Sequence, residues 1–406
     1  MNAPADSAAV RRGNLSLVLR HIAAHAPCAR TEIAAATGLV HASVTALVAD
    51  LMARGLVRED GAASGGGRGR PRRLLRLMPE RVRIIAAHVT WDRIDVVTSG
   101  LAGDPVEVVR RPGPSPFDPR ERLADAVRDA VTEAAPPAPG VHPGGLVIAL
   151  AAPVPSAGIT LTGVDDAGPP LAALVAERLP GLGCPVDVVN DADMAALAEY
   201  HLLAAARPGA AAGTVAFVKS DSGVAGALLV DGRVHPGSHG LAGELGHLPV
   251  AFDGPRCRCG AYGCLSLYIG AGAVCDAAGL SEPGGGPPGR ARAVTELGRR
   301  LRAGEPAALA ALDRAGHALG AAIQSIVGVT DAGEIILGGH LADWAPWLTP
   351  GIDARLAPRR TAFPDARITV TPGTLGRPAA LHGAVRTARD RVLADPTTVG
   401  QAQPGR

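Results

Sequence analysis

The sequence predicts an α/β protein with a small helical head near the N-terminus and a larger body, and three observations lead to this prediction. Apolar residues near the N-terminus recur at helical spacing on both sides of a tight turn at Gly38. A stretch rich in glycine and arginine follows, and Pro79 interrupts the pattern after it. From Arg83 onward, strand-like and helix-like segments alternate, which is typical of helices packed over sheets.

The composition is that of a globular chain. Its 406 residues are enough for two or three domains, and 47% of them are hydrophobic against 19% charged. Glycine, proline or a charge interrupts each apolar run, and the N-terminus lacks the apolar core of a secretory signal. We therefore expect a cytoplasmic protein with reduced thiols and no membrane contact. The expected division is a head at residues 1–78, a body at 79–395 and a disordered tail at 396–406.

Three helices are expected in the head. Apolar residues at helical spacing predict a first helix over residues 14–25, and Thr31 can cap a short second helix that ends at Gly38. A third helix is predicted over residues 42–54. Two helices joined by a short glycine-containing turn form the helix-turn-helix pattern, and a plain three-helix bundle is the alternative.

A winged hairpin is predicted after the third helix. Residues 56–58 and 73–77 are its expected strands, and residues 61–69 are its flexible tip. Glycines let the backbone approach a duplex closely, while Arg68 and Arg70 can enter a narrow minor groove. A mere linker is the alternative interpretation of this tip. The third helix offers three polar side chains to base edges or phosphates of the major groove: His41, Ser43 and Thr45.

The placement of charge also favours double-stranded DNA as a partner. The net charge is only +2, yet arginines crowd into the region of the predicted wing. A local basic patch on a nearly neutral protein indicates a polyanion contact confined to one module. Aromatic residues make up only 2% of the chain, which argues against a base-stacking surface for single strands.

A cysteine-rich loop in the body predicts a structural zinc site. Half of the six cysteines fall within a few residues of one another, as Cys257, Cys259 and Cys264, and His247 precedes them. Four nitrogen and sulfur donors suit a closed tetrahedral Zn²⁺ site, and nearby glycines supply the bends that let one loop wrap an ion. The alternative is a set of reduced cysteines beside an incidental histidine.

Together with the Glu-x-Gly-His motif from Glu244 to His247, this loop resembles the signature of the ROK family of sugar kinases and sugar-responsive transcription factors. The resemblance extends over about residues 14–390. It implies that the body is a two-lobed, actin-like and ribonuclease-H-like domain of the sugar-kinase type. The two lobes of that fold enclose a sugar cleft.

The resemblance breaks down where the kinases of the family bind ATP phosphates. Those kinases need an Asp-x-Gly-x-Thr turn, whereas residues 88–93 place His88 at the carboxylate position. Bulky Trp91 and anionic Asp92 stand where phosphate would require glycine and a hydroxyl. A second expected phosphate turn, at residues 219–226, keeps only part of its glycine pattern and adds Asp221. We therefore expect no ATP phosphotransfer and no enzyme activity.

The sugar side of the cleft matches the family better. Asn190 and Asp191 match its sugar-contacting pair, and the aspartate accepts the hydroxyl proton in the kinases. Glu244 and His247 match further positions that reach the sugar. Helix capping is the alternative role for the Asn-Asp pair. One departure is Ser266, which stands where the family usually has a glutamate that accepts from a sugar hydroxyl.

The resemblance and the residues together predict a ROK-type transcriptional regulator, expected to be a repressor. Its expected partners are a double-stranded operator, a small effector such as a sugar or sugar phosphate, and further copies of itself in a homodimer or homotetramer. The alternative is an active sugar kinase with an added DNA-binding head. A constitutive DNA-binding protein without an effector is a third reading, favoured by Ser266.

Overall fold

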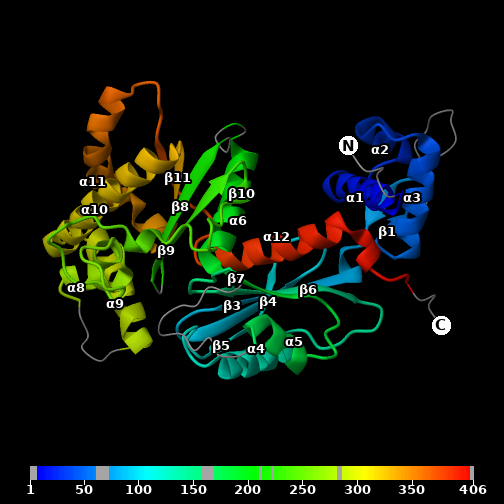
Figure 1. Ribbon diagram of the computed structural model, residues 1–406, viewed down its shortest axis with the longest axis horizontal. Coiled ribbons are helices and arrows are strands. Elements are labelled where there is room, and N and C mark those ends of the chain that lie inside the picture. The colour runs from blue at the N-terminus through cyan, green and yellow to red at the C-terminus, as the bar shows by residue number, and fades with distance from the viewer. Residues whose placement is uncertain are drawn as a thin grey trace.

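The protein is a head joined to a two-lobed body, as seen in the computed structural model (Figure 1). The structure describes residues 7–60, 73–156, 169–207, 209, 213–221, 223–280 and 286–402. Every structural statement below concerns these residues.

The head is a winged helix-turn-helix, as predicted. It contains α1 (Ser7–His25), α2 (Arg30–Thr37), α3 (His41–Ala53) and the antiparallel pair β1 (Val57–Glu59) and β2 (Leu75–Leu77). Gly38 adopts φ +71° and ends α2 in the left-handed conformation that favours glycine. The apolar faces of α1 and α3 are fully buried in one core. The first helix begins earlier than predicted, because its first turns are exposed and carry no apolar periodicity.

The first lobe of the body is built on a five-stranded sheet of order β5-β4-β3-β6-β7. Its first three strands form an antiparallel meander, and β6 and β7 continue the sheet parallel to β3. Helices α4 and α5 pack together below this sheet in Figure 1. The bounds are β3 (Val82–Val89), β4 (Arg93–Ser99), β5 (Val106–Pro112), α4 (Arg120–Ala134), β6 (His142–Leu150), α5 (Leu171–Arg178) and β7 (Val186–Asn190).

The second lobe repeats this topology in a sheet of order β10-β9-β8-β11-β12. Again the first three strands are antiparallel, and the last two run parallel to the first. The repeat is the duplication expected of an actin-like body. The bounds are β8 (Thr214–Ser220), β9 (Val224–Val230), β10 (Arg233–Val234), β11 (Glu334–Gly339) and β12 (Thr369–Pro372).

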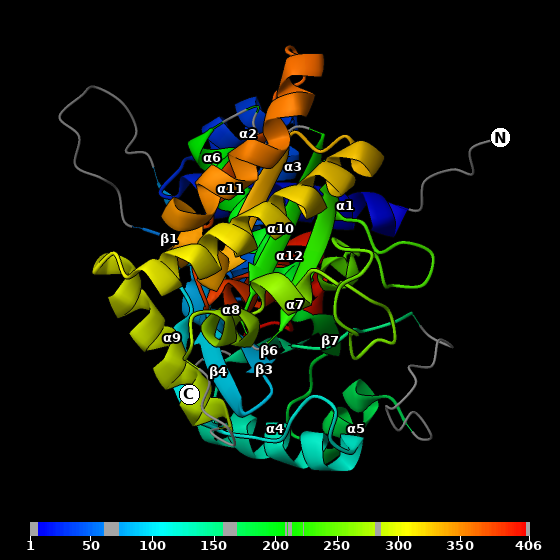
Figure 2. The ribbon, with the colours of Figure 1, turned by 90° about the vertical axis from the view of Figure 1, so that its left-hand side faces the viewer.

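Helices α10 and α11 cover the outer side of the second sheet (Figure 2). They pack closely, because Gly316 and Gly351 leave no room for a Cβ between the two helix backbones. The helices of this lobe are α7 (Ser266–Ile269), α8 (Ala271–Ala277), α9 (Gly286–Arg302), α10 (Pro306–Thr330) and α11 (His340–Ala362). Their apolar side chains form the core of the lobe.

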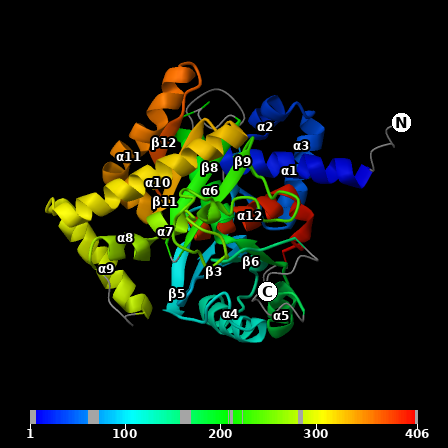
Figure 3. The ribbon, with the colours of Figure 1, turned by 60° about the vertical axis from the view of Figure 1, so that its left-hand side comes forward.

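Two helices connect the lobes and the head. Helix α6 (Asp191–Ala206) packs along α12 (Ala379–Ala394), and α12 also crosses β3 and β6 before it meets α1 of the head (Figure 3). The fit between α6 and α12 requires Gly383, where a Cβ would lie 1.9 Å from the Met194 carbonyl oxygen. The guanidinium of Arg20 in α1 donates to Asp390 near the end of α12.

The expectation of a disordered tail from residue 396 is wrong for residues 396–402. Arg54 of the head donates to the carbonyl oxygens of Thr397 and Val399, and the Ala402 amide donates to the Ala53 carbonyl oxygen. Val399 is completely buried in the head-side core. The segment therefore has long-range partners that its own composition does not indicate.

Among the described residues, no single helix has both the length and the apolar character needed to cross a membrane. The bent pair α2 and α3 meets those criteria only when its two helices are counted together. Both belong to the packed head, where Ile33 and Val44 are fully buried.

Candidate effector site and metal cluster

Helix α6 begins directly after β7, and this junction carries the predicted Asn-Asp pair. The Asn190 side-chain oxygen accepts from the amides of Ala192 (2.7 Å) and Asp193 (3.2 Å), and its amide group donates to the Ala152 carbonyl oxygen (3.0 Å). Asn190 therefore caps α6, which is the alternative role considered from the sequence. A contact from this residue to an effector stays a prediction.

Asp191 is held by two side chains that come from different lobes. Its Oδ2 atom accepts from Lys219 Nζ at 2.6 Å and lies 3.0 Å from His88 Nε2. All three side chains are at least 95% buried, with Asp191 only 2% exposed. Lys219 donates in addition to Asp221 at 3.2 Å. One oxygen of the predicted effector-binding carboxylate is thus already occupied by internal partners.

The charges of this cluster stabilise one another. Burial alone would raise the pKa of Asp191, but the Lys219 ammonium and His88 lower it to about 2. Burial likewise opposes the charge of Lys219, but Asp191 and Asp221 hold the pKa of this ammonium above its usual range. Asp191 and Lys219 therefore form a buried ion pair that stays charged at neutral pH.

His88 and Lys219 occupy equivalent places in the duplicated sheets. Each is the last residue but one of the first strand of its lobe, β3 or β8. The sequence marks His88 as a departure from the kinase motif and predicts Lys219 in a phosphate turn, not beside Asp191. A signal was present, because Lys219 is the single lysine of the chain.

Trp91 lies in the turn between β3 and β4 and extends toward the equivalent turn of the second lobe. Its indole N–H donates to the Ala151 carbonyl oxygen at 3.2 Å, and a Cβ added to Gly223 would lie 3.9 Å from the ring. The ring also meets Phe117 edge-on, with 5.7 Å between centroids. On the metal-loop side, the Arg258 guanidinium carbon lies 5.7 Å from the indole centroid. The indole is thus fixed between the two turns and the cysteine-rich loop.

Two further carboxyl groups neighbour Asp191. Burial, together with the charges of Asp191 and Glu244, raises the pKa of Asp193 to about 7. Burial and Asp191 also raise the pKa of Glu244, although His247 acts in the opposite direction. A carboxyl group accepts hydrogen bonds when ionised and can also donate one when protonated, so these side chains suit the hydroxyls of a bound polyol.

His247, Cys257, Cys259 and Cys264 form a cluster that can bind a metal ion. Their ligand atoms all lie within 4.8 Å of one another, and two neighbouring pairs, Cys257 Sγ with His247 Nδ1 and Cys259 Sγ with Cys264 Sγ, are 3.6 Å apart. In a tetrahedral zinc site with Zn–S bonds of about 2.3 Å, sulfur atoms lie about 3.8 Å apart. The donor set and its spacing therefore fit a single tetrahedral ion.

The cysteine-rich loop is shaped by close backbone contacts. At Gly263, which has φ +63°, a Cβ would lie 1.7 Å from the Ala251 carbonyl oxygen. Isolated bridges pair Pro249 with Cys264 and Arg256 with Tyr262. Burial raises the pKa of Cys264 to about 12, whereas at Cys257 hydrogen bonds from the Cys259 amide and neighbouring side chains outweigh burial and lower the pKa to about 6. Ser266 Oγ lies 4.0 Å from Cys257 Sγ, at the edge of the cluster.

The predicted DNA-contacting residues are only partly described. His41 is the first residue of α3, and both His41 and Thr45 are exposed, while Ser43 is half-buried. The Thr45 hydroxyl donates to the His41 carbonyl oxygen at 2.9 Å. The tip of the wing, with Arg68 and Arg70, lies outside the described residues. Their contact with DNA remains a prediction.

A winged-helix head on a two-lobed body of the sugar-kinase type defines a recognisable class of protein. Residues 92–391 match the profile of the ROK family, and residues 16–68 match that of the MarR family. Because the first match covers more than half of the chain, the chain belongs to the ROK family.

Individual relatives include both regulators and kinases. The chain is 22% identical to the xylose repressor of Bacillus subtilis over 96% of its own length and 98% of the repressor. It is 39% identical to an N-acetylmannosamine kinase of Vibrio cholerae over 22% of this chain, which spans 30% of that kinase. A kanosamine kinase of Amycolatopsis mediterranei is 30% identical over 49% of the chain and 61% of the kinase.

Solved structures share the fold. A ROK family transcriptional regulator described as a homolog of the E. coli MLC protein superposes with a TM-score of 0.75 at 21% identity, over 96% of this chain and 99% of the other. A ROK family glucokinase from Streptomyces griseus superposes with a TM-score of 0.60 at 24% identity, over 76% of this chain and 99% of the other. The extra coverage by the regulator includes the head.

Proposed function

We propose that the chain is a DNA-binding transcriptional repressor whose body binds a small sugar-type effector and does not transfer phosphate from ATP. Membership of the ROK family and the winged-helix head support the regulator. The similarity to the xylose repressor of Bacillus subtilis, which extends over nearly the whole of both chains, favours repression.

The observation that carries the proposal is the engagement of Asp191 by Lys219 and His88. In the kinases that this chain resembles, the aspartate at this position accepts a proton from the sugar hydroxyl. A general base works best when its pKa lies near the working pH, whereas the pKa of Asp191 is lowered to about 2. The Lys219 ammonium lies 2.6 Å from Asp191 Oδ2, so this oxygen is already engaged by a cation.

The turns that would bind ATP phosphates also argue against phosphotransfer. Backbone amides of glycine-rich turns bind phosphate because no side chain stands in the way. Here the Trp91 indole is fixed close to Gly223 by its hydrogen bond to Ala151. A triphosphate would have to displace this ring.

The cysteine-rich loop is proposed to hold a structural Zn²⁺ through His247, Cys257, Cys259 and Cys264. Bound zinc supplies a fixed tetrahedral link between the two ends of the loop. With Nδ1 of His247 facing Cys257 Sγ, its Nε2 is left to donate to an effector hydroxyl. Glu244 and Asp193 supply acceptors beside it, and Asp191 contributes through any oxygen that Lys219 leaves free.

The route from effector to DNA is proposed to run through α6 and α12. The effector residues Asn190 and Asp191 lie at the start of α6, and α6 packs along α12, which meets the head at Arg20. A change in lobe closure would therefore alter the orientation of the head. In a homodimer or homotetramer, this would change the spacing of two heads on a two-fold operator.

Two assays on the full-length protein test this proposal. In the first, fluorescence anisotropy follows binding to DNA from its own promoter region, with and without xylose, glucose and N-acetylmannosamine. We expect tight, salt-dependent binding that at least one sugar weakens. Failure to bind duplex DNA would refute the repressor, and indifference to every sugar would favour the constitutive DNA-binding protein.

The second assay distinguishes a sugar kinase from a regulator without phosphotransfer. A sugar kinase is the second candidate because the chain is similar to N-acetylmannosamine kinases. A coupled ATP assay over the same sugars should give no turnover above that of an Asp191→Asn control. Turnover that disappears in this control would overturn the non-enzymatic reading.

A further inference from the structure

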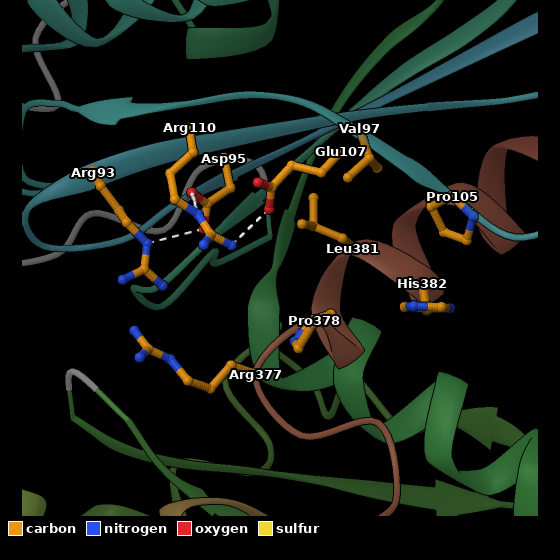
Figure 4. Close-up of a pocket in the computed structure, with 10 residues that line it drawn as sticks. All are labelled: Arg93, Asp95, Val97, Pro105, Glu107, Arg110, Arg377, Pro378, Leu381 and His382. Carbon is orange, nitrogen blue, oxygen red and sulfur yellow. Dashed lines mark hydrogen bonds and ion pairs between the residues drawn. The ribbon is translucent and has the colours of Figure 1, made fainter. Parts of the chain in front are cut away.

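A cavity of about 410 Å³ lies between the first lobe and the beginning of α12. Its lining residue Asp95 is paired across β3 and β4 with His88 of the Asp191 cluster, but neither His88 nor Asp191 lines the cavity. One side is formed by β4 and β5, and the other by the segment that leads from β12 into α12 (Figure 4). Cavities of this size are typical of sites for small ligands. Its lining residues include three arginines, two carboxylates and one histidine: Arg93, Arg110, Arg377, Asp95, Glu107 and His382.

The carboxylates neutralise only part of the positive charge of the cavity. Asp95 is almost completely buried and accepts from the Nε atoms of Arg93 (2.9 Å) and Arg110 (3.1 Å). Glu107 accepts from Arg110 Nη2 at 2.6 Å. These bonds fix Arg93 and Arg110 in place and still leave the terminal nitrogens of Arg93 to face the cavity. Three arginines against two carboxylates leave a net positive charge.

Arg377 supplies the unbalanced charge. It lies just before Pro378, the N-cap residue of α12, and within the described part of the chain it has no hydrogen-bond or ion-pair partner. In Figure 4 its guanidinium extends toward that of Arg93, across the cavity. Two like charges that point toward one another from different segments form a complementary site for an anion between them.

We propose that this cavity binds a small phosphate-bearing anion, either free phosphate or a phosphate ester. Guanidinium groups bind phosphate oxygens in bidentate geometry, and Arg93 is already oriented for this by Asp95. The cavity is larger than a phosphate ion, so a phosphorylated metabolite fits the remaining volume. Asp95 and Glu107 make it a poor site for a longer polyanion.

The position of the cavity gives the ligand a means to act on the head. Arg377 precedes α12 and Arg93 belongs to the first lobe, so an anion held by both ties the start of α12 to β4. The other end of α12 meets α1 through Arg20 and Asp390. The bound anion therefore favours one orientation of α12 and, with it, of the head. The residues that line this cavity differ from the proposed sugar contacts, and the proposed anion binding requires neither DNA nor zinc.

Isothermal titration calorimetry on the full-length protein tests the proposal, with inorganic phosphate, glucose 6-phosphate and glucose as probes at constant ionic strength. We expect binding of at least one of the two phosphates. Tighter binding of glucose 6-phosphate than of inorganic phosphate would assign the site to an ester, and the reverse would assign it to the free ion. Absence of binding by both would overturn the proposal.

Three variants locate the binding. Arg377→Gln removes an exposed side chain without a described partner, and it should weaken phosphate binding about tenfold or more. Arg386→Gln, within α12 and outside the cavity lining, is the matched control and should leave the affinity unchanged. Glu107→Gln removes a competing anion and should tighten binding, a gain that misfolding cannot produce. Equal affinity of Arg377→Gln and the wild type would show that phosphate binds elsewhere and would overturn the proposal.

Discussion

The first hairpins of the two lobes have the same topology but contribute different chemistry. The β3–β4 turn carries Trp91, whose ring extends to the other lobe, while the β8–β9 turn presents Gly223 to that ring. At the equivalent position of the preceding strands, one lobe supplies His88 and the other Lys219. Both of these side chains meet Asp191. The two lobes thus keep the same strand order, while their side chains fill the space between the two turns and occupy Asp191.

The largest expected effect comes from removing the cation of the second hairpin. Lys219→Met should destabilise the protein by about 3–5 kcal/mol, because it leaves the buried Asp191 carboxylate without its ammonium partner. Urea unfolding followed by circular dichroism measures the loss. The double variant Lys219→Met/Asp191→Asn should recover much of it, since no buried charge then remains. A loss below about 1 kcal/mol in the single variant would contradict the assigned ion pair.

The metal cluster belongs to the second lobe, so a substitution there tests a feature of that lobe alone. Cys259→Ser should abolish stoichiometric zinc binding, because a tetrahedral site loses one of its four ligands. Metal analysis of the purified protein gives the result directly. Cys275→Ser, at a buried cysteine outside the cluster, is the control and should keep its zinc. Stoichiometric zinc in the Cys259 variant would show that this residue is not a ligand.

A smaller effect is expected from the carboxyl beside the ion pair. The pKa of Asp193 is about 7 in the folded protein and its ordinary value is 3.8, so folding favours the protonated form. The contribution of Asp193 to the free energy of unfolding is therefore fully favourable below about pH 4 and is lost as the pH rises through 7. Asp193→Asn should be more stable than the wild type at pH 8, by roughly 2 kcal/mol, and similar to it at pH 4.5. Parallel stability profiles for the two proteins would contradict this account.

The smallest expected effect concerns the turn of the first hairpin. Trp91→Ala should cost about 1–2 kcal/mol, because the ring is only half-buried and loses one hydrogen bond. It should also open the space between the two turns without creating kinase activity, since Asp191 stays paired with Lys219. Thermal unfolding and a coupled ATP assay measure the two outcomes. Appearance of turnover would show that the Trp91 indole, and not the pairing of Asp191 with Lys219, prevents phosphotransfer.

Local patterns predicted much of the molecule. Helical periodicity around Leu15 and Val44 predicts the helices of the head. The close spacing of Cys257, Cys259 and Cys264 indicates a cluster, and the structure brings their ligand atoms within metal-binding distance. The sequence does not predict the start of α1 at Ser7, because exposed helical turns carry no apolar signal. These features can be predicted, or escape prediction, according to the pattern of residues close in the chain.

Contacts between distant segments could not be predicted in the same way. Lys219 and His88 approach Asp191 only because two sheets face each other, and no local pattern records that approach. The cavity around Arg377 joins β4, β5 and the start of α12, which are widely separated in sequence. The order of residues 396–402 is not predictable from their own composition for the same reason, since their partners Ala53 and Arg54 belong to the head.

The docking of residues 396–402 against the head has a consequence for the order of events during synthesis. The head leaves the ribosome first, but Thr397 and Val399, which bind Arg54, are made only after the whole body. A nascent chain can thus fold its head early while the angle between head and body stays unset. Until residues 396–402 are made, the head lacks one of the contacts that orient it on the body.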